Sequence, residues 1–359
     1  MKNHPLCGWM IIGGGRKNFG DFSLFSFVFV GKTLYKRMVF RYNKKVRMLD
    51  YVFFRSGLRT QATTANMPHR EFMKIAQNWT DYSIIATGDG YKLERWKDVY
   101  LLRPDPQVIW SARADLFSYP ELNAFYKRSE SGGGGWKFLK PMPAEWEISY
   151  EKLGLRFKIK PMGFKHTGLF PEQAVNWDYM SKLIRGANRS IKVLNLFAYT
   201  GGATVACAKA GAQVTHVDAA KGMVERAGEN ARLSGIGSGI RYIVDDCLKF
   251  VRREIRRGNR YDAIIMDPPS YGRGPGGEMW KIENDLFPFV KLCGELLSEN
   301  PLFFLINSYT TGLQPMVLKN ILTLTLSGRG GHTEAYEVGI KTEEGIDLPC
   351  GAGGVFVND

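Results

Sequence analysis

Short apolar runs alternate with amphipathic stretches along the second half of the chain. The apolar runs have the length of buried strands and lie at 191–197, 213–217, 240–244, 261–266, 302–306 and 334–340. The stretches between them place apolar residues three or four positions apart, which predicts helices at 203–210, 222–233, 247–257, 285–297 and 315–326. This alternation predicts an α/β fold with a doubly wound, mainly parallel, Rossmann-like sheet.

A different pattern precedes this region. Residues 82–103 alternate between apolar and polar positions around the turn Gly88-Asp89-Gly90, which predicts a hairpin. A second hairpin is expected at 146–150 and 155–159, and the glycines of 131–135 are typical of a flexible connector. We therefore expect a small β-rich N-terminal domain at 67–160 and a larger α/β domain at 161–359.

The positive charge of the chain is concentrated at its start. The 359 residues carry 49 Lys+Arg and 35 Asp+Glu, a net charge of +14, but residues 1–66 alone hold twelve Lys/Arg and two acids. We interpret 1–66 as a basic leader that is disordered or a non-native extension, and Met67 as a better start than Met48. Its apolar run at 22–30 is shorter than the about 20 residues that span a bilayer, so we expect no membrane partner.

Cysteine and histidine spacing argues against a structural metal site. The five cysteines include no C-x-x-C pair, and the five histidines include no i, i+4 pair. We expect no metal, no disulfide framework and a reducing, cytoplasmic location. We also expect His216, which lies in a predicted strand, to be a core residue.

Residues suited to binding a small molecule follow four of the predicted strands. The first strand ends in the small-residue turn Asn195–Gly202, which lets a ligand approach the backbone. The second ends in Asp218, which could accept hydrogen bonds from ribose hydroxyls. The third ends in Asp245-Asp246-Cys247, where an acid could bind the amino group of an adenine. Doubly wound sheets bind ligands at these carboxyl ends.

The fourth strand ends in Asp267-Pro268-Pro269-Ser270-Tyr271, a rigid turn with an aromatic residue that could stack on a planar substrate. Each strand end also has a plainer interpretation. The glycines could be turn residues only, Asp218 and Asp246 could cap helices, and the prolines could form a surface turn. The absence of G-x-G-x-x-G and of a Walker lysine disfavours dinucleotides and ATP.

These four segments resemble the motifs of class I S-adenosylmethionine-dependent methyltransferases. The resemblance is greater to the bacterial group related to the large-subunit ribosomal RNA cytosine-C5 methyltransferases, whose upstream motif is similar to Thr167–Gln173 here. It covers about residues 160–345 and implies S-adenosyl-L-methionine as cofactor and RNA, above all ribosomal RNA, as partner. A protein or small-molecule substrate, or an RNA-binding module without activity, is the alternative.

The resemblance also implies site residues. It assigns binding of the cofactor to one set of positions: Phe170, Gln173, Phe197, Ala198, Tyr199, Thr200, Gly201, Asp218, Ala219, Asp246, Cys247 and Asp267. It assigns the catalytic positions to Asp267, Pro268, Pro269 and Tyr271.

One departure from the family concerns the nucleophile. Methylation of cytosine C5 needs a thiolate that attacks C6, and the related enzymes carry that cysteine after the fifth strand. Here the fifth strand is followed by Asn307-Ser308-Tyr309, and Cys350 lies in a Gly-rich tail without a motif. We therefore expect transfer to a base atom without a cysteine nucleophile, which requires placement and, where needed, proton removal.

Three groups of cations could contact RNA phosphates. They are the arginines of 252–260, the lysines Lys158, Lys160 and Lys165, and Lys137 and Lys140 beside Trp136. A solvated helix end explains the first group as well as RNA binding does. Ordinary packing between domains explains the last group equally well.

Overall fold

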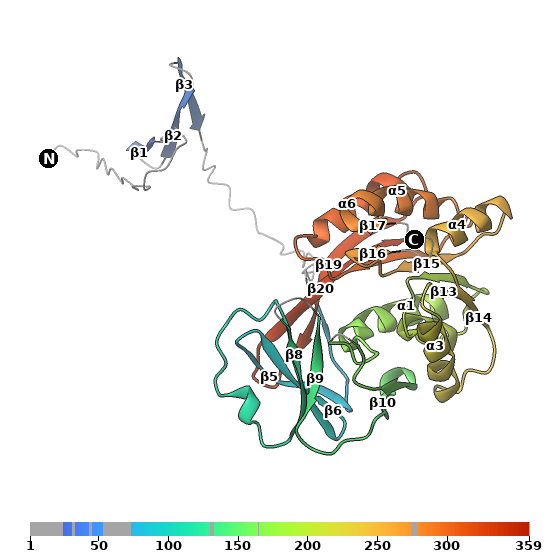
Figure 1. Ribbon diagram of the computed structural model, residues 1–359. Coiled ribbons are helices and arrows are strands. Elements are labelled where there is room, and N and C mark those ends of the chain that lie inside the picture. The colour runs from blue at the N-terminus through green and yellow to red at the C-terminus, as the bar shows by residue number, and fades with distance from the viewer. Residues whose placement is uncertain are drawn as a thin grey trace, which may run out of the picture. The chain divides into compact units, whose positions relative to one another are not determined.

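The computed structural model describes residues 73–129, 133–163, 165–273 and 279–358, together with three strands further upstream. Residues 1–69 and 70–359 form separate compact units (Figure 1). In the first unit the strands β1 (Leu24–Val30), β2 (Thr33–Tyr42) and β3 (Lys45–Val52) pair in an antiparallel sheet. Most of the remaining basic leader lies outside the described residues, and its disorder or non-native origin stays a prediction.

The second unit is built on an eight-stranded sheet with the order β14-β13-β12-β15-β18-β20-β19-β4. Five adjacent strands run parallel: β14 (Ile240–Val244), β13 (Gln213–Asp218), β12 (Lys192–Leu196), β15 (Ala263–Met266) and β18 (Phe303–Ser308). The order reverses at β12, from which the chain winds first to one side and then to the other. The prediction of a doubly wound, mainly parallel sheet is confirmed.

Helices cover both faces of this sheet because neighbouring residues of each strand point to opposite sides. Val193 of β12 packs in one core with helices α1 (Ala174–Gly186), α2 (Gly202–Lys209) and α3 (Lys221–Leu233). Leu194 packs in another with α4 (Cys247–Arg256), α5 (Ile282–Gly294) and α6 (Pro315–Leu326). Figure 1 shows α1 and α3 on one side and α4 to α6 on the other.

The β-rich region forms a second sheet beside the first. Its strands, in sheet order, are β5 (Tyr82–Gly88), β6 (Tyr91–Trp96), β7 (Val99–Pro104), β8 (Leu122–Arg128) and β9 (Gly134–Phe138). The predicted second hairpin is present as β10 (Trp146–Tyr150) and β11 (Leu155–Ile159). Short 3₁₀ turns lie at Leu116–Ser118, Glu151–Leu153 and Pro171–Gln173.

The two regions share one buried core. Trp96 of the β-rich sheet, Phe157 of β11 and Trp177 of α1 belong to the same cluster as Val193. Strand β4 (Met73–Ala76) also leaves the β-rich segment and pairs in parallel with β19 at the edge of the large sheet. The division at residue 160 stays a prediction, and buried side chains pack across it.

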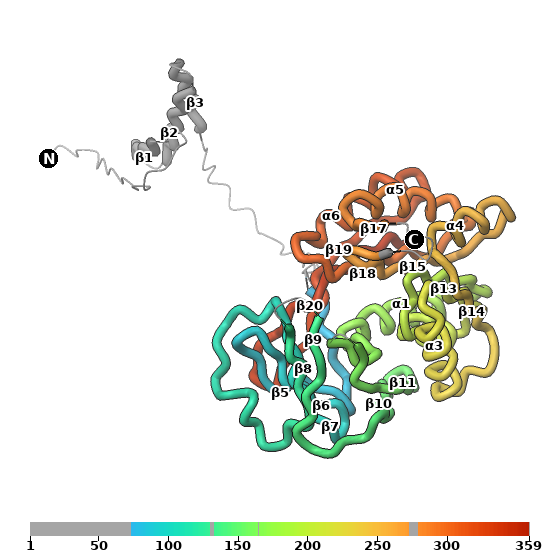
Figure 2. Tube along the Cα trace, viewed as in Figure 1, coloured from blue at the N-terminus to red at the C-terminus, as the bar shows by residue number. Residues whose placement is uncertain are grey.

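The glycine-rich C-terminal segment is a strand rather than a tail without structure. Strand β20 (Asp347–Val357) lies antiparallel between β18 and β19 (His332–Lys341). A Cβ at Gly353 would lie 2.5 Å from the Tyr336 ring, so the glycine lets an aromatic side chain cover the strand. The β19–β20 hairpin also reaches the β-rich sheet, where Thr342 bridges Ile84, and the red tube in Figure 2 follows this course.

Two further elements were not predicted from sequence. Strands β16 (Tyr271–Arg273) and β17 (Met279–Lys281) form a short hairpin directly after the Asp-Pro-Pro turn.

Within the described residues, no helix combines the length and the apolar character that crossing a membrane requires.

Candidate active site at the carboxyl ends of the strands

A cavity of about 450 Å³ lies where the parallel strands end. Its wall is formed by the end of β13, the segments that follow β12, β14, β15 and β18, and the segment before α1. Its lining residues are His166, Phe170, Phe197, Tyr199, Asp218, Ala219, Ala220, Asp246, Cys247, Leu248, Asp267, Pro268, Pro269, Ser270, Gly272, Trp280 and Tyr309.

The turn after β12 is tightly curled. Phe197, Tyr199 and Gly201 have φ values of 52°, 50° and 84°, in the left-handed region that side chains disfavour. At Gly201, the N-cap of α2, a Cβ would also lie 2.7 Å from the Ala227 Cβ of α3. The curl brings the backbone of 197–201 along the edge of the cavity.

Asp218 holds this turn from the next strand. One carboxylate oxygen accepts a hydrogen bond from the Tyr199 amide at 2.8 Å, and the other accepts one from the Ala220 amide at 2.9 Å. Burial raises the pKa of Asp218, and the two amides oppose that rise. Each oxygen retains a lone pair that could accept a hydroxyl from a ligand.

Asp246 combines the two roles that the sequence left open. Its side chain caps α4 by accepting a hydrogen bond from the Lys249 amide at 2.8 Å, and it also lines the cavity. The neighbouring Cys247 is buried, and its Sγ accepts a hydrogen bond from the Phe197 amide at 3.3 Å. Burial raises the pKa of the Cys247 thiol, so it is neutral at physiological pH.

Asp267 lies at the end of β15, on the wall of the cavity. Burial, followed by the nearby Glu172 carboxyl, raises the pKa of Asp267 to about 7. The prolines after it donate no backbone hydrogen bonds. The Pro269 carbonyl accepts a hydrogen bond from the Trp280 indole at 2.6 Å. Trp280 of β17 thereby becomes part of the cavity wall, its ring centroid 5.4 Å from that of Phe197.

Tyr271 occupies a different place from the one its motif suggests. The residue belongs to β16, is 54% exposed, and its hydroxyl donates to the Met279 sulfur at 3.3 Å. The aromatic side chains on the cavity side of the Asp-Pro-Pro turn are those of Trp280 and Tyr309.

A smaller pocket of about 50 Å³ adjoins the cavity, and Phe170 lines both. Ala198, Thr200 and Gln173 line this pocket. The Gln173 amide donates to the Tyr309 hydroxyl at 2.7 Å and accepts from Asn176 at 2.8 Å. Gln173 therefore fixes Tyr309 in the cavity wall.

The residues of the cavity wall that sequence reasoning missed include three with ring side chains: His166, Trp280 and Tyr309. Tyr309 carried a usable signal because it follows the fifth strand, at the edge where ligands bind. Trp280 carried none, since it reaches the cavity through a hairpin that the sequence did not predict. Burial, together with Arg103, lowers the pKa of His166 to about 4, so its ring is neutral at physiological pH.

His216 is a core residue, as its position in a predicted strand indicated. It is fully buried, and its Nδ1 lies 2.9 Å from the Thr204 hydroxyl.

No group of three or more His, Cys, Asp or Glu residues within the described ranges is arranged to hold a metal ion.

The basic groups differ in how far they are neutralised. Lys158 and Lys160 both pair with Glu145, at 3.9 and 3.1 Å. In α4, Arg253 pairs with Asp245, whereas Arg252 and Arg256 are exposed. The end of α4 lies near a cleft lined by Lys192, Gln213 and Ile240, the first residues of their strands, and so faces away from the cavity.

The chain is similar to known proteins both in sequence and in structure. Residues 122–307, more than half of the chain, match a protein family described as S-adenosylmethionine-dependent methyltransferase. A crystal structure of the SAM-dependent methyltransferase from Agrobacterium tumefaciens is 33% identical and superposes with a TM-score of 0.76, covering 81% of this chain and 95% of that one.

Two similar curated proteins carry the name ribosomal RNA large subunit methyltransferase K/L. The one from Shewanella frigidimarina is 33% identical over 225 residues, which are 61% of this chain and 29% of that protein. The one from Allochromatium vinosum is 35% identical over 161 residues, which are 44% of this chain and 21% of that protein. The matched region thus spans less than a third of the length of these curated relatives.

Proposed function

We propose that this chain, which belongs to the S-adenosylmethionine-dependent methyltransferase family, transfers a methyl group from that cofactor to a base atom of ribosomal RNA. The observation that carries the proposal is the cavity at the strand ends, where four predicted segments meet. The names of the two curated relatives support RNA as the substrate. An RNA substrate and four free cysteines suit a reducing cytoplasm.

The cavity fits the cofactor in size and chemistry. Its volume of about 450 Å³ falls within the roughly 300–1,000 Å³ of small-molecule sites. Asp218 would accept the ribose hydroxyls, and Asp246 and Cys247 would border the adenine. The curled backbone of 197–201 would surround the methionine end. Phe170, Phe197 and Trp280 would supply apolar walls.

When bound, the cofactor supplies an electrophilic methyl group, and the chain positions the acceptor. Asp267 would hold the amino or ring nitrogen of the target base. With a pKa of about 7, its carboxyl group is present in both protonation states at neutral pH and could accept a proton from that nitrogen. Pro268 and Pro269 would keep Asp267 in a fixed position and leave no competing backbone donor.

The cysteines favour a nitrogen or oxygen acceptor over cytosine C5. Burial raises the pKa of all four described cysteines: Cys207, Cys247, Cys293 and Cys350. A thiol with a raised pKa is a poor nucleophile at neutral pH. The position after the fifth strand, where related enzymes carry the nucleophile, holds Tyr309.

Transfer of a radiolabelled methyl group to purified, unmodified ribosomal RNA tests the proposal, with cofactor binding measured separately by calorimetry. We expect wild-type protein to bind the cofactor and label RNA. Asp218→Ala should bind the cofactor at least about tenfold more weakly, because hydrogen bonds to a charged group are worth roughly 1.5–3 kcal/mol.

The two measurements separate the two parts of the proposal. Absence of cofactor binding by wild-type protein, or an unchanged affinity in Asp218→Ala, would refute the site. Normal cofactor binding with no label in RNA would refute the substrate and would favour a protein or small molecule.

A further inference from the structure

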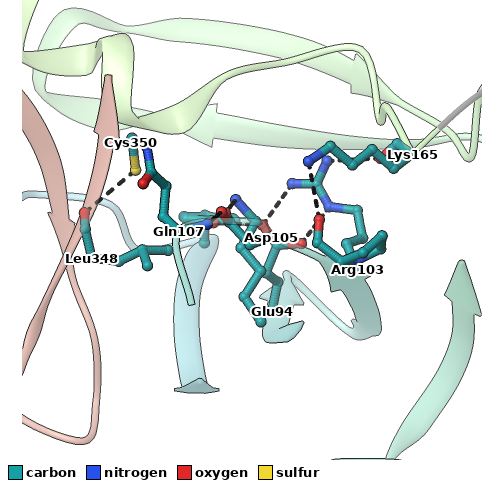
Figure 3. A network of polar contacts seen from close by, with 10 residues as sticks. Glu94, Arg103, Asp105, Gln107, Lys165, Leu348 and Cys350 are labelled. Atoms are coloured by element: carbon teal, nitrogen blue, oxygen red, sulfur yellow. Dashed lines mark hydrogen bonds and ion pairs between the residues drawn. The ribbon is translucent and has the colours of Figure 1, made fainter. Parts of the chain in front are cut away.

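A second cavity, of about 120 Å³, adjoins the first and is enclosed between the β-rich sheet and the segment before α1. His166, Phe170 and Tyr309 line both cavities and form the wall between them. The residues of its charged side come from β6, β7 and the turn at 165, and β20 contributes Cys350 (Figure 3). We call it the anion cavity.

Two of its cations are already neutralised. Arg103 donates two hydrogen bonds to the buried Glu94 carboxylate, at 2.5 and 2.6 Å. Lys92 pairs with Asp105 at 3.1 Å. Figure 3 shows Arg103 lying between Glu94 and Lys165. These contacts fix the walls of the cavity but leave no excess charge of their own.

Among the described residues, Lys165 is the lining cation whose ammonium group forms no ion pair, although the Asp105 charge acts on it from a greater distance. Its ammonium group donates to the Pro104 carbonyl at 3.0 Å, and within the described ranges it forms no ion pair. Burial, followed by the positive charge of Lys92, lowers its pKa to about 8. Arg128, exposed at the end of β8, adds a further positive charge close enough to act on Lys165.

The carboxyl groups of this region pair with the other two cations. Glu94 and Asp105 hold Arg103 and Lys92, and Glu172, whose pKa burial raises, forms no ion pair with Lys165 within the described residues. Lys165 is therefore a cation in a partly enclosed cavity whose ammonium group contacts no carboxylate in the described part of the chain. Such a site favours an anionic ligand.

We propose that the anion cavity binds a phosphate of the RNA backbone beside the target nucleotide, with Lys165 as its main ligand and Arg128 as a second, exposed cation nearby. The inference rests on the proposed RNA substrate. The volume suits a small anionic group better than a whole nucleotide, since small-molecule sites usually enclose about 300 Å³ or more. A phosphate held there would present the adjoining nucleotide across Phe170 and Tyr309 to Asp267.

Features of the β8–β9 hairpin also support binding of RNA next to the anion cavity. The Trp136 indole donates to the Met162 carbonyl at 2.9 Å, which ties the hairpin to the segment that carries Lys165. Arg128 lies on the same face of the hairpin as Trp136 and Phe138, and Phe138 is 62% exposed. The exposed Lys127 and Lys137 lie on the opposite face. Cations beside an exposed aromatic ring are typical of surfaces that bind single-stranded nucleic acid.

The test measures binding of unmodified ribosomal RNA over a series of salt concentrations. We expect Lys165→Gln to bind about tenfold more weakly and to lower the magnitude of the salt slope by about 0.7–0.9, the value for one phosphate contact. Arg128→Gln should also weaken RNA binding and lower the magnitude of the salt slope, but by less than Lys165→Gln does. Lys165→Arg should retain affinity within about threefold, because it keeps the charge.

Arg256→Gln is the matched control, since it removes an exposed cation at the end of α4, near the amino ends of the parallel strands and away from the cavity. We expect it to leave RNA affinity unchanged, and we expect every variant to bind S-adenosylmethionine as wild type does. An unchanged affinity and slope in Lys165→Gln would overturn the inference, and a loss in Arg256→Gln alone would place the RNA on α4. Failure of wild-type protein to bind RNA would overturn the proposed substrate, and this inference with it.

Discussion

At the scale of single residues, the carboxyl group of Asp267 lies where burial opposes its ionisation. Within the described residues, its carboxylate accepts no hydrogen bond and forms no ion pair that would hold the charged form, and the nearby Glu172 adds to the rise in its pKa. A functional carboxyl group in such a place lowers the stability of the folded protein at the pH where the protein works.

Asp267→Asn is expected to stabilise the fold at high pH. The folded-state pKa of about 7 exceeds the ordinary value of 3.8, so wild-type protein loses stability as pH rises between these values. The asparagine variant avoids that loss. We expect its Tm to exceed that of wild type by about 2 °C or more at pH 8, with the difference vanishing at pH 4.

Asp262→Asn provides the opposite case. Burial alone would raise the pKa of Asp262, but the Lys192 amide and Arg189 lower it overall. The variant should be less stable than wild type at pH 8, with the deficit shrinking as pH falls below 4. Equal pH dependence of the two variants in thermal unfolding would contradict the assignment of Asp267 as a poorly stabilised carboxyl group.

At the scale of elements, the turn between β12 and α2 is the most constrained part of the site. Gly201→Ala would introduce a Cβ 2.7 Å from that of Ala227, at a φ of 84°. We expect a loss of at least about 2 kcal/mol in the free energy of unfolding and a clear loss of cofactor affinity, measured by denaturant titration and calorimetry.

Gly222→Ala is the matched substitution in the neighbouring helix α3. Nothing lies within 4 Å of its added Cβ. Alanine in a helix is favoured over glycine by about 0.5–1 kcal/mol. We expect a small gain in stability and unchanged cofactor binding. If both variants bound the cofactor like wild type, the turn would not be part of the binding site.

The elements that sequence patterns predicted are those with regular periodicity. The parallel strands and the helices α2 to α6 were found because each buries one clear apolar face. Strand β20 was missed because its glycines match a loop, whereas their role is to let Tyr336 and Leu318 pack against the strand. Helix α1 was missed because Asn176 is a buried polar residue, two of whose partners, Asn307 and Tyr336, lie far from it in the sequence.

The candidate site was predictable where residues follow strands directly, as Asp218, Asp246 and Asp267 do. It was not predictable where contacts between residues far apart in the sequence determine which side chains reach the cavity or pair with one another. Lys165, Lys158 and Lys160 look alike in the sequence. Lys158 and Lys160 form ion pairs with Glu229 and Glu145, whereas Lys165 forms none within the described residues. The sequence shows which residues are charged, but the tertiary fold determines which charged residues pair.

At the scale of the whole molecule, residues 1–69 and 70–359 are separate units, and all parts of both cavities lie in the second. We expect a protein beginning at Met67 to fold with an unchanged Tm and to bind S-adenosylmethionine as the full chain does. Its net charge is lower by about ten, so weak, non-specific RNA binding should decline. Loss of cofactor binding on truncation would show that the leader belongs to the enzyme.

The central claim is that this chain places a methyl group on a base of ribosomal RNA. Mass spectrometry of the nucleosides of ribosomal RNA, from cells with and without the protein, tests it most directly. We predict that one methylated nucleoside is absent without the protein and is restored by the wild-type chain but not by Asp218→Ala. An identical set of methylated nucleosides in both kinds of cell would contradict the claim.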